Sequence, residues 1–340
     1  MKFRNVFALV CLLLLTSCTS PAARTALVPA AEDTEPLSQI PLSSSGFAYY
    51  AIQEDGTLVG WGDNIRLTLP GCCPSPDQAA AIMDRAIGVY GGDWVTLILD
   101  EDHTLWGLGC GGGPFCLLMD TPWEDPPQLV KLLEDVVTAG SKGEEATALL
   151  EDGTVVRWGA QGTEQVVTDC TALWLGAGCS YALTEGGQLV GWGHGLPIEG
   201  MREMWSREPQ LILEDAGDVV SLACYHDILC CLRSDGTLWR TGWDKNDAFL
   251  PWEQWKQDVI ACMDQFYLTS DYRLWMWDRD NDPVVLMENG AAAVNGEQGI
   301  MALDRDGVLW RVDLDEDRRP SLTRVMDGIR TPEHPVVRQP

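Results

Sequence analysis

The sequence predicts an all-β protein, a seven-bladed β-propeller closed by the C-terminal strand. Three observations predict this fold. The stretch EDGTLVGWG at residues 54–62 returns in six altered copies, so the chain is a repeat protein. Each copy places a turn between two short apolar runs, which is typical of a hairpin. The turn positions 55, 102, 152, 186, 235, 271 and 306 lie 47, 50, 34, 49, 36 and 35 residues apart, in the range of propeller blades.

The turns themselves are the clearest local signal. An Asp-Gly pair favours a tight hairpin in which both turn residues take positive φ. Four copies contain it, at Asp55-Gly56, Asp152-Gly153, Asp235-Gly236 and Asp306-Gly307. In two other copies His103 and Tyr272 take the Gly position, where positive φ costs more, so we expect a different turn there. The strand after each turn is apolar on both faces, so it needs sheets on both sides, as in a radial stack of small sheets.

A further strand signature precedes each hairpin, so every unit contains at least three strands. Residues 136–140, VVTAG, are one example. Residues 321–331 repeat this signature with no hairpin after them, and the first hairpin has only a poor version before it, at 40–45. We therefore expect residues 321–331 to complete the first blade and close the ring, which would remove two exposed sheet edges.

The complete unit is VVxxAxG followed by ALxEDGTLWGWG. Over residues 40–330 it resembles the regulator of chromosome condensation repeat family. The chain resembles a bacterial lipoprotein member of that family with seven repeats. The resemblance implies the propeller fold. It implies no single activity, because the family includes nuclear exchange factors, ubiquitin ligase modules and a secreted bacterial inhibitor of β-lactamases, and a fold does not carry an activity. Members with exchange activity are nuclear or cytosolic, a setting that the N-terminus of this chain excludes.

The N-terminus predicts export. Lys2 and Arg4 precede ten apolar residues at 6–15, too few to span a bilayer and typical of a signal peptide. The following Leu-Thr-Ser-Cys resembles a bacterial lipobox, in which Cys18 would receive the lipid and become the mature N-terminus. The alternative is ordinary cleavage near Ala22 or Ala23. We expect an extracytoplasmic protein whose only membrane contact is the lipid on Cys18, since several acyl chains on one residue anchor stably.

This gives four segments: a lipoprotein signal peptide at 1–17, a tether at 18–38, the propeller at 39–331 and a tail at 332–340. The tether is rich in Ala, Pro, Thr and acidic residues and shows no strand alternation.

The charge narrows the class of partner. The formal net charge is −28, and removal of residues 1–17, with two basic residues and no acidic one, would leave −30. Such a charge argues against nucleic acid, because Lys and Arg supply most of that affinity. It also disfavours docking of the body onto anionic lipid or wall polymers. A basic partner is permitted, but a solvated surface explains most of the charge. We expect a monomer.

The cysteines leave two interpretations. Twelve are present, and ten lie outside the leader and Cys18. An even number in an exported protein is compatible with disulfides. Cys224 and Cys262, however, fill a small apolar position of the repeat, where a reduced thiol behaves as a small hydrophobe. Cys110 and Cys116, which flank a loop, are the best candidates for a disulfide.

No catalytic, cofactor or metal site is predicted. The sequence has no nucleophile elbow, no phosphate-binding glycine loop and no HExxH motif. The acidic stretches 278–282 and 313–317 lack the Gly and the distal Glu of an EF-hand. The four His residues are scattered, and CxxC is absent.

The long spacings predict where a ligand would bind. They place insertions after the first, second and fourth copies, all on one side of the propeller, and these are more apolar than surface loops need be. One interpretation is a binding rim; the other is that they cover blade edges. The first insertion holds Leu69, Pro70, Cys72 and Cys73. The proposed rim residues are Phe115, Leu117, Leu118, Trp123, Pro197, Ile198, Met201, Met204 and Trp205, with Leu196 beside them.

We therefore expect a non-enzymatic, membrane-anchored module that recognises an envelope or extracellular protein or glycan. The alternative is a surface polysaccharide hydrolase or lyase on a propeller scaffold. Two carboxylates converging in the central channel or in one rim pocket would favour the enzyme.

Overall fold

The computed structural model describes residues 41–332, except 46, 64–68, 70–72, 74, 93–94, 110–128, 143–144, 160–161, 177 and 279–280. These residues form seven four-stranded antiparallel sheets, and one 3-10 helix, η1 (Pro76–Gln78), is the only helix among them. None of the described helices could span a membrane.

Each sheet uses four strands that are consecutive in the chain and run in order from the inner to the outer edge. The inner strands are β1 (Leu42–Ser44), β5 (Ala86–Gly91), β9 (Val136–Lys142), β13 (Cys170–Leu175), β17 (Val219–Tyr225), β21 (Val259–Met263) and β25 (Gly290–Gly296). The second strands are β2 (Ala48–Ile52), β6 (Val95–Asp100), β10 (Glu145–Leu150), β14 (Cys179–Thr184), β18 (Ile228–Arg233), β22 (Phe266–Thr269) and β26 (Gly299–Asp304).

The remaining strands complete the blades. The third strands are β3 (Leu58–Gly62), β7 (Leu105–Gly109), β11 (Val155–Gly159), β15 (Leu189–His194), β19 (Leu238–Trp243), β23 (Leu274–Met276) and β27 (Leu309–Leu314). The outer strands are β4 (Ala80–Met83), β8 (Val130–Leu133), β12 (Gly162–Val167), β16 (Trp205–Leu213), β20 (Phe249–Lys256), β24 (Val284–Met287) and β28 (Pro320–Met326). The sequence pattern had indicated at least three strands a unit. The outer strand was missed because it is half-exposed and has no strict motif.

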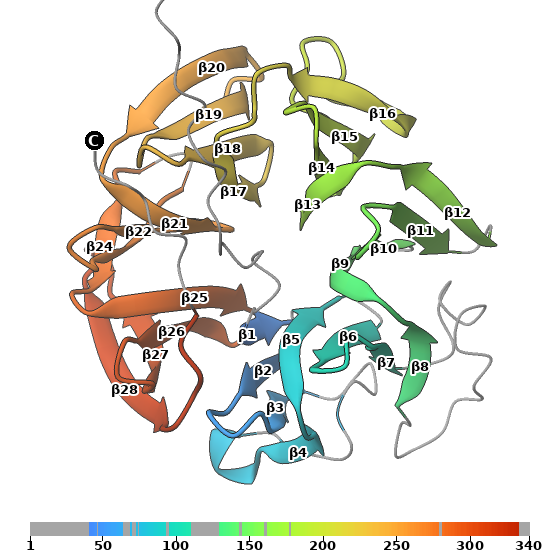
Figure 1. Ribbon diagram of the computed structural model, residues 1–340. Coiled ribbons are helices and arrows are strands. Elements are labelled where there is room, and N and C mark those ends of the chain that lie inside the picture. The colour runs from blue at the N-terminus through green and yellow to red at the C-terminus, as the bar shows by residue number, and fades with distance from the viewer. Residues whose placement is uncertain are drawn as a thin grey trace, which may run out of the picture. The chain divides into compact units, whose positions relative to one another are not determined.

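The seven sheets form a closed ring. Each inner strand contacts the inner strand of the next blade, and β25 of the seventh blade contacts β1 of the first (Figure 1). The apolar second and third strands are buried between neighbouring blades; all five residues of β2 and all five of β3 are buried. The predicted all-β, seven-bladed propeller is confirmed. Its two-sided apolar strands are explained by sheets packing on both faces.

The hairpin turns differ from the prediction in two ways. In the first blade the Gly56 amide donates to the Gln53 carbonyl and Gln53 donates to Thr57, which is a type I turn followed by one left-handed residue. Only that last residue has positive φ, 88° at Gly56, so the expected turn with two positive-φ residues is wrong. His103 and Tyr272 keep the same turn, with φ of 57° and 62°. The different turn expected there is also wrong, because the preserved hydrogen bonds hold these residues in the left-handed region.

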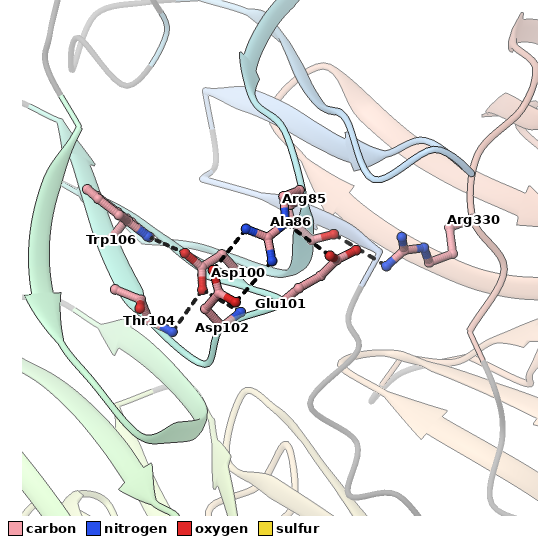
Figure 2. A network of polar contacts seen from close by, with 8 residues as sticks. All are labelled: Arg85, Ala86, Asp100, Glu101, Asp102, Thr104, Trp106 and Arg330. Atoms are coloured by element: carbon pink, nitrogen blue, oxygen red, sulfur yellow. Dashed lines mark hydrogen bonds and ion pairs between the residues drawn. The ribbon is translucent and has the colours of Figure 1, made fainter.

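An aspartate at the end of the second strand holds two of these turns. One Asp100 carboxylate oxygen accepts the amides of Asp102 and Thr104 at 3.0 and 2.9 Å, and the other accepts Trp106 Nε1 at 2.8 Å (Figure 2). Asp304 makes the same three bonds in the last blade, to Asp306, Val308 and Trp310. Both aspartates are buried, so each must be fully bonded to be tolerated.

The ends of the ring meet differently from the expectation. Residues 321–326 do not add a strand to the first blade: they belong to β28, which pairs with β27. In the chain, the outer strand of one blade comes directly before the inner strand of the next. The signature seen before each hairpin therefore includes residues of both strands. The residues just after β28 do reach the first blade. Ile329 is bridged to Gln53, and Arg330 donates its amide to Ile52 at 2.9 Å.

This bridge has a counterpart in the other blades. The inner strand β5 opens with the pair Ala86 and Asp100, and the Ala86 amide donates to Gly56 of the preceding turn. Ile329 likewise donates to Gly307 of the last turn while it faces Gln53. Ile329, from the segment after β28, thus supplies the first position of the first inner strand, and β1 supplies the rest. Arg330 also donates from Nη1 to the Ala86 carbonyl at 3.3 Å, which reaches the second blade (Figure 2).

All of the described cysteines are free thiols, and none of them forms a disulfide. Cys230, Cys231 and Cys262 are buried in the core of the fifth and neighbouring blades, which agrees with the core-thiol interpretation of Cys262. Cys224 is half-buried and packs against the core of the fourth blade. The proposed disulfide pair Cys110 and Cys116 lies outside the described residues.

Candidate binding surface

Each blade has two ends. Because its strands are antiparallel, the hairpin turns and the blade-to-blade links lie at one end, and the other two links lie at the opposite end. We call the second end the insertion side, since all three long insertions join a third strand to an outer strand. Phe115, Leu117, Leu118 and Trp123 of the second insertion lie outside the described residues, as does the lipid-attachment residue Cys18.

The first insertion is described only in part, and that part covers a blade. Leu69 is fully buried and lies against Gly60, where a Cβ would come within 2.6 Å of the Leu69 side chain. Cys73 is also buried, and its carbonyl accepts the Gly62 amide at 2.7 Å. Pro70 and Cys72 are not described. Leu69 and Cys73 therefore fit the blade-covering interpretation.

The third insertion, residues 195–204, is described throughout and divides into two parts. Its first part packs inward. Leu196 is fully buried in the core of the fourth blade, Pro197 is buried, and Ile198 and Met201 pack against that core from its edge. These four residues pack on the blade, which favours the blade-covering interpretation for this part of the insertion.

The insertion is also fixed to the neighbouring blade. Arg202 pairs with Asp227 at 2.9 Å and with Asp247, both of the fifth blade. Within the insertion, Gly195 donates to the Met204 carbonyl at 3.0 Å and so closes its base. The segment is therefore held at its base, through its apolar side chains and through Arg202.

The last part of the insertion points outward. Met204 is 53 % exposed and Trp205 56 % exposed, which makes them two of the four large hydrophobic side chains that are exposed among the described residues. The other two, Leu211 and Leu322, lie on the outer strands β16 and β28. Trp205 opens β16 opposite His194. An adjacent Met and Trp on a fixed support can anchor a partner, because these residue types are enriched at interfaces.

A small cavity lies beside the insertion, between the fourth and fifth blades. It has a volume of about 40 Å³, enough for a few water molecules but far below a substrate pocket. Cys179, Tyr181, His194, Cys224, His226 and Asp227 are among the residues that line it. Burial raises the pKa of Cys179 to about 12 and that of Tyr181 well above its usual value. Among the described residues, no group of three His, Cys, Asp or Glu side chains is placed to hold a metal ion.

Sequence reasoning missed this cavity. Its residues come from β14, β15, β17, β18, the third insertion and the link between β17 and β18, and they share no motif. Cys179 begins a second strand and Cys224 lies near the end of an inner strand, so the two cysteines occupy different positions of the repeat and no sequence signal pairs them.

A partly buried group of charged side chains joins the third and fourth blades. The Arg157 side chain, only 5 % exposed, pairs with Glu164 and donates to the Arg207 carbonyl at 3.1 Å. Arg207 also pairs with Glu164, at 2.7 Å. Hydrogen bonds from Arg157 and then Arg207 lower the pKa of Glu164. These contacts fix β16, the strand that presents Trp205, against β12.

Comparison with known proteins tests the repeat assignment. No family model matches the chain. A stretch of 225 residues, 55 % of the chain, is 27 % identical to the human E3 ubiquitin-protein ligase HERC2, and the mouse protein matches at 26 %. The match covers about 4 % of the length of these curated relatives.

Solved structures show the same fold. Prp20p from Saccharomyces cerevisiae, also described as yeast RCC1, has a TM-score of 0.53 at 15 % identity, over 84 % of this chain and 76 % of that one. The repeats of this chain are therefore similar to those of the regulator of chromosome condensation repeat family, in sequence to HERC2 and in fold to yeast RCC1. Human WBSCR16 has a similar fold, with a TM-score of 0.62 at 15 % identity over 78 % of this chain and 86 % of its own.

Proposed function

We propose that this protein is an exported, non-enzymatic binding module, anchored to the bacterial cell membrane through a lipid on Cys18, and that it recognises an envelope or extracellular protein. The exposed pair Met204 and Trp205 at the end of a fixed insertion is the observation that supports this most directly. The repeat family contributes a precedent only: one related structure is described by its binding to Gsp1p and histones.

The chemistry of the pair favours a protein over a glycan. Met is flexible and polarisable and suits apolar partner surfaces, and the exposed Trp indole adds a large contact area. A glycan site would also need polar groups around the aromatic face. The nearby Arg202 is already engaged with two aspartates, so it is not available for that role.

The alternative, a polysaccharide hydrolase or lyase, needs two carboxylates that converge on one bond. The seven described inner strands surround the axis of the ring, and none of them contains Asp or Glu. The cavity beside the insertion contributes a single carboxylate, Asp227. These observations support the binding module over the enzyme.

Membrane anchoring is tested by substitution of Cys18. In the Cys18→Ala variant the thiol needed for lipid attachment is lost, so the protein should leave the membrane fraction. The measurement is fractionation of cells with detection of the protein, together with the mass of the mature N-terminus. Ala22→Asp, which alters the alternative cleavage region, should leave the fractionation unchanged. A Cys18→Ala protein that is processed normally and stays in the membrane fraction would exclude the lipoprotein.

The binding surface is tested at Trp205. Trp205→Ala removes an exposed side chain, so the melting temperature should change little, while affinity for the envelope partner should fall by about 2 kcal/mol or more if Trp205 is a hot spot. Met204→Ala should also lower the affinity for the envelope partner. The matched control is Leu322→Ala, an exposed apolar residue on the seventh blade.

The measurement is capture of envelope proteins by wild type and variants side by side, followed by a Kd for the protein that is lost. If Trp205→Ala and Leu322→Ala capture the same proteins equally well, the partner binds elsewhere. Loss of binding to an envelope glycan instead of a protein would change the class of the ligand.

A further inference from the structure

Two thiols face each other across the seam between the fourth and fifth blades. Cys179 opens β14, and Cys224 lies near the end of β17. Both line the small cavity beside the insertion. The Tyr181 hydroxyl lies within hydrogen-bonding reach of both thiols, so the two sulfur atoms share one neighbour.

Backbone positions place the two residues close together. Gly176 stands opposite Cys179 in the link between β13 and β14, and its amide donates to the Cys179 carbonyl at 2.8 Å. A Cβ on Gly176 would lie 2.5 Å from the Cβ of Cys224 and 2.9 Å from its sulfur. Cβ atoms of opposite residues on a sheet are about 5 Å apart, and a disulfide needs about 3.8 Å. Because Gly176 has no Cβ, Cys224 can pack against this link directly beside the position opposite Cys179. A disulfide then requires the link to move so that the two Cβ atoms reach bonding range.

We propose that Cys179 and Cys224 form an interblade disulfide when the protein meets an oxidising thiol–disulfide partner. Cys224 is the only described cysteine that is not fully buried, so this pair is the one that a small disulfide can reach; Cys230, Cys231 and Cys262 lie near one another but are buried in the core. The inference is independent of what the insertion side binds.

The reaction balances with a small disulfide as oxidant. The more exposed Cys224, as thiolate, attacks one sulfur of glutathione disulfide and displaces one glutathione thiolate. Cys179 then attacks the Cys224 sulfur of this mixed disulfide, its proton passes to the second departing glutathione, and the interblade S–S bond forms. The two protein thiols lose two electrons, and the oxidant becomes two glutathione thiols.

The bond would act on the insertion. In the reduced protein the Cys179 thiol donates to the His194 carbonyl at 2.8 Å, one residue before the insertion begins. Oxidation removes that bond and ties β14 to β17. Burial also raises the pKa of Cys179 to about 12. A thiol of high pKa is a poor leaving group, so the disulfide should resist reduction once formed.

The test uses the full chain, reduced and then exposed to glutathione disulfide. After the remaining thiols are alkylated, peptide mapping without reductant should find the Cys179 and Cys224 peptides joined and Cys230, Cys231 and Cys262 alkylated. The oxidised wild type should melt a few degrees higher than the reduced form, and Cys224→Ser should show no such difference. Cys170→Ser, a buried thiol of the same blade, should retain the joined peptides.

Two results would overturn the inference. One is recovery of both peptides alkylated after prolonged oxidation. The other is their recovery only as separate mixed disulfides with glutathione. Both readouts are made on the wild-type chain, so they do not depend on the folding of any variant.

Discussion

Removal of residues 327–340 should abolish the unfolding of the propeller as a single cooperative unit. This deletion leaves β28 in place and takes away the bridge to the first blade together with the residues that follow it. Ile329 is fully buried in a core shared by the first and last blades. Its loss, with the backbone bonds of Gly328, Ile329 and Arg330, should cost on the order of 5 kcal/mol, a large part of the stability of a domain.

The reason is that these residues join the two ends of the chain. Without Ile329 the first inner strand lacks its opening residue, and the seam between β25 and β1 depends on side chains alone. Calorimetry or denaturant unfolding should then show a broad or split transition. Deletion of residues 333–340 is the matched control and should leave one transition. A single transition with an unchanged midpoint in the longer deletion would show that the ring closes without this bridge.

Asp100→Ala should destabilise the protein by about 2–4 kcal/mol. The substitution removes the acceptor of two turn amides and of Trp106 Nε1 together, as the close contacts in Figure 2 show. Asp100 is buried, so the orphaned donors cannot all regain water. Asp304→Ala should behave alike, since Asp304 makes the same three bonds.

A double-mutant cycle separates the indole bond from the turn bonds. Trp106→Phe removes the indole donor, so Asp100→Ala should cost less free energy of unfolding in that variant than in wild type. The control is Asp152→Ala: Asp152 is exposed and accepts the Thr154 amide in an equivalent turn, so a much smaller loss is expected. The measurement is the free energy of unfolding in urea. If Asp100→Ala and Asp152→Ala lower the free energy of unfolding equally, the buried hydrogen bonds of Asp100 do not contribute the stability assigned to them.

The sequence alone determined the repeat, the number of blades and the two-sided burial of the central strands. These features are local or periodic. An Asp-Gly turn and an apolar strand such as β3 can be recognised from fewer than ten residues, and the same pattern recurs, in altered copies, in every repeat. The predicted rim was only partly informative, because apolar residues of a loop look the same whether buried, like Leu196, or exposed, like Trp205.

The tertiary structure decided what depends on residues far apart in the chain. His103 keeps a left-handed turn because hydrogen bonds within the hairpin and to Val136 of the next blade outweigh its local preference. The Arg330 side chain bonds to Ala86, 244 residues away, and Cys224 comes to lie beside Cys179. No periodic pattern encodes such pairs, since each exists only once, at a seam between blades. Their positions follow from packing, where burial of the faces of seven sheets fixes which backbones meet.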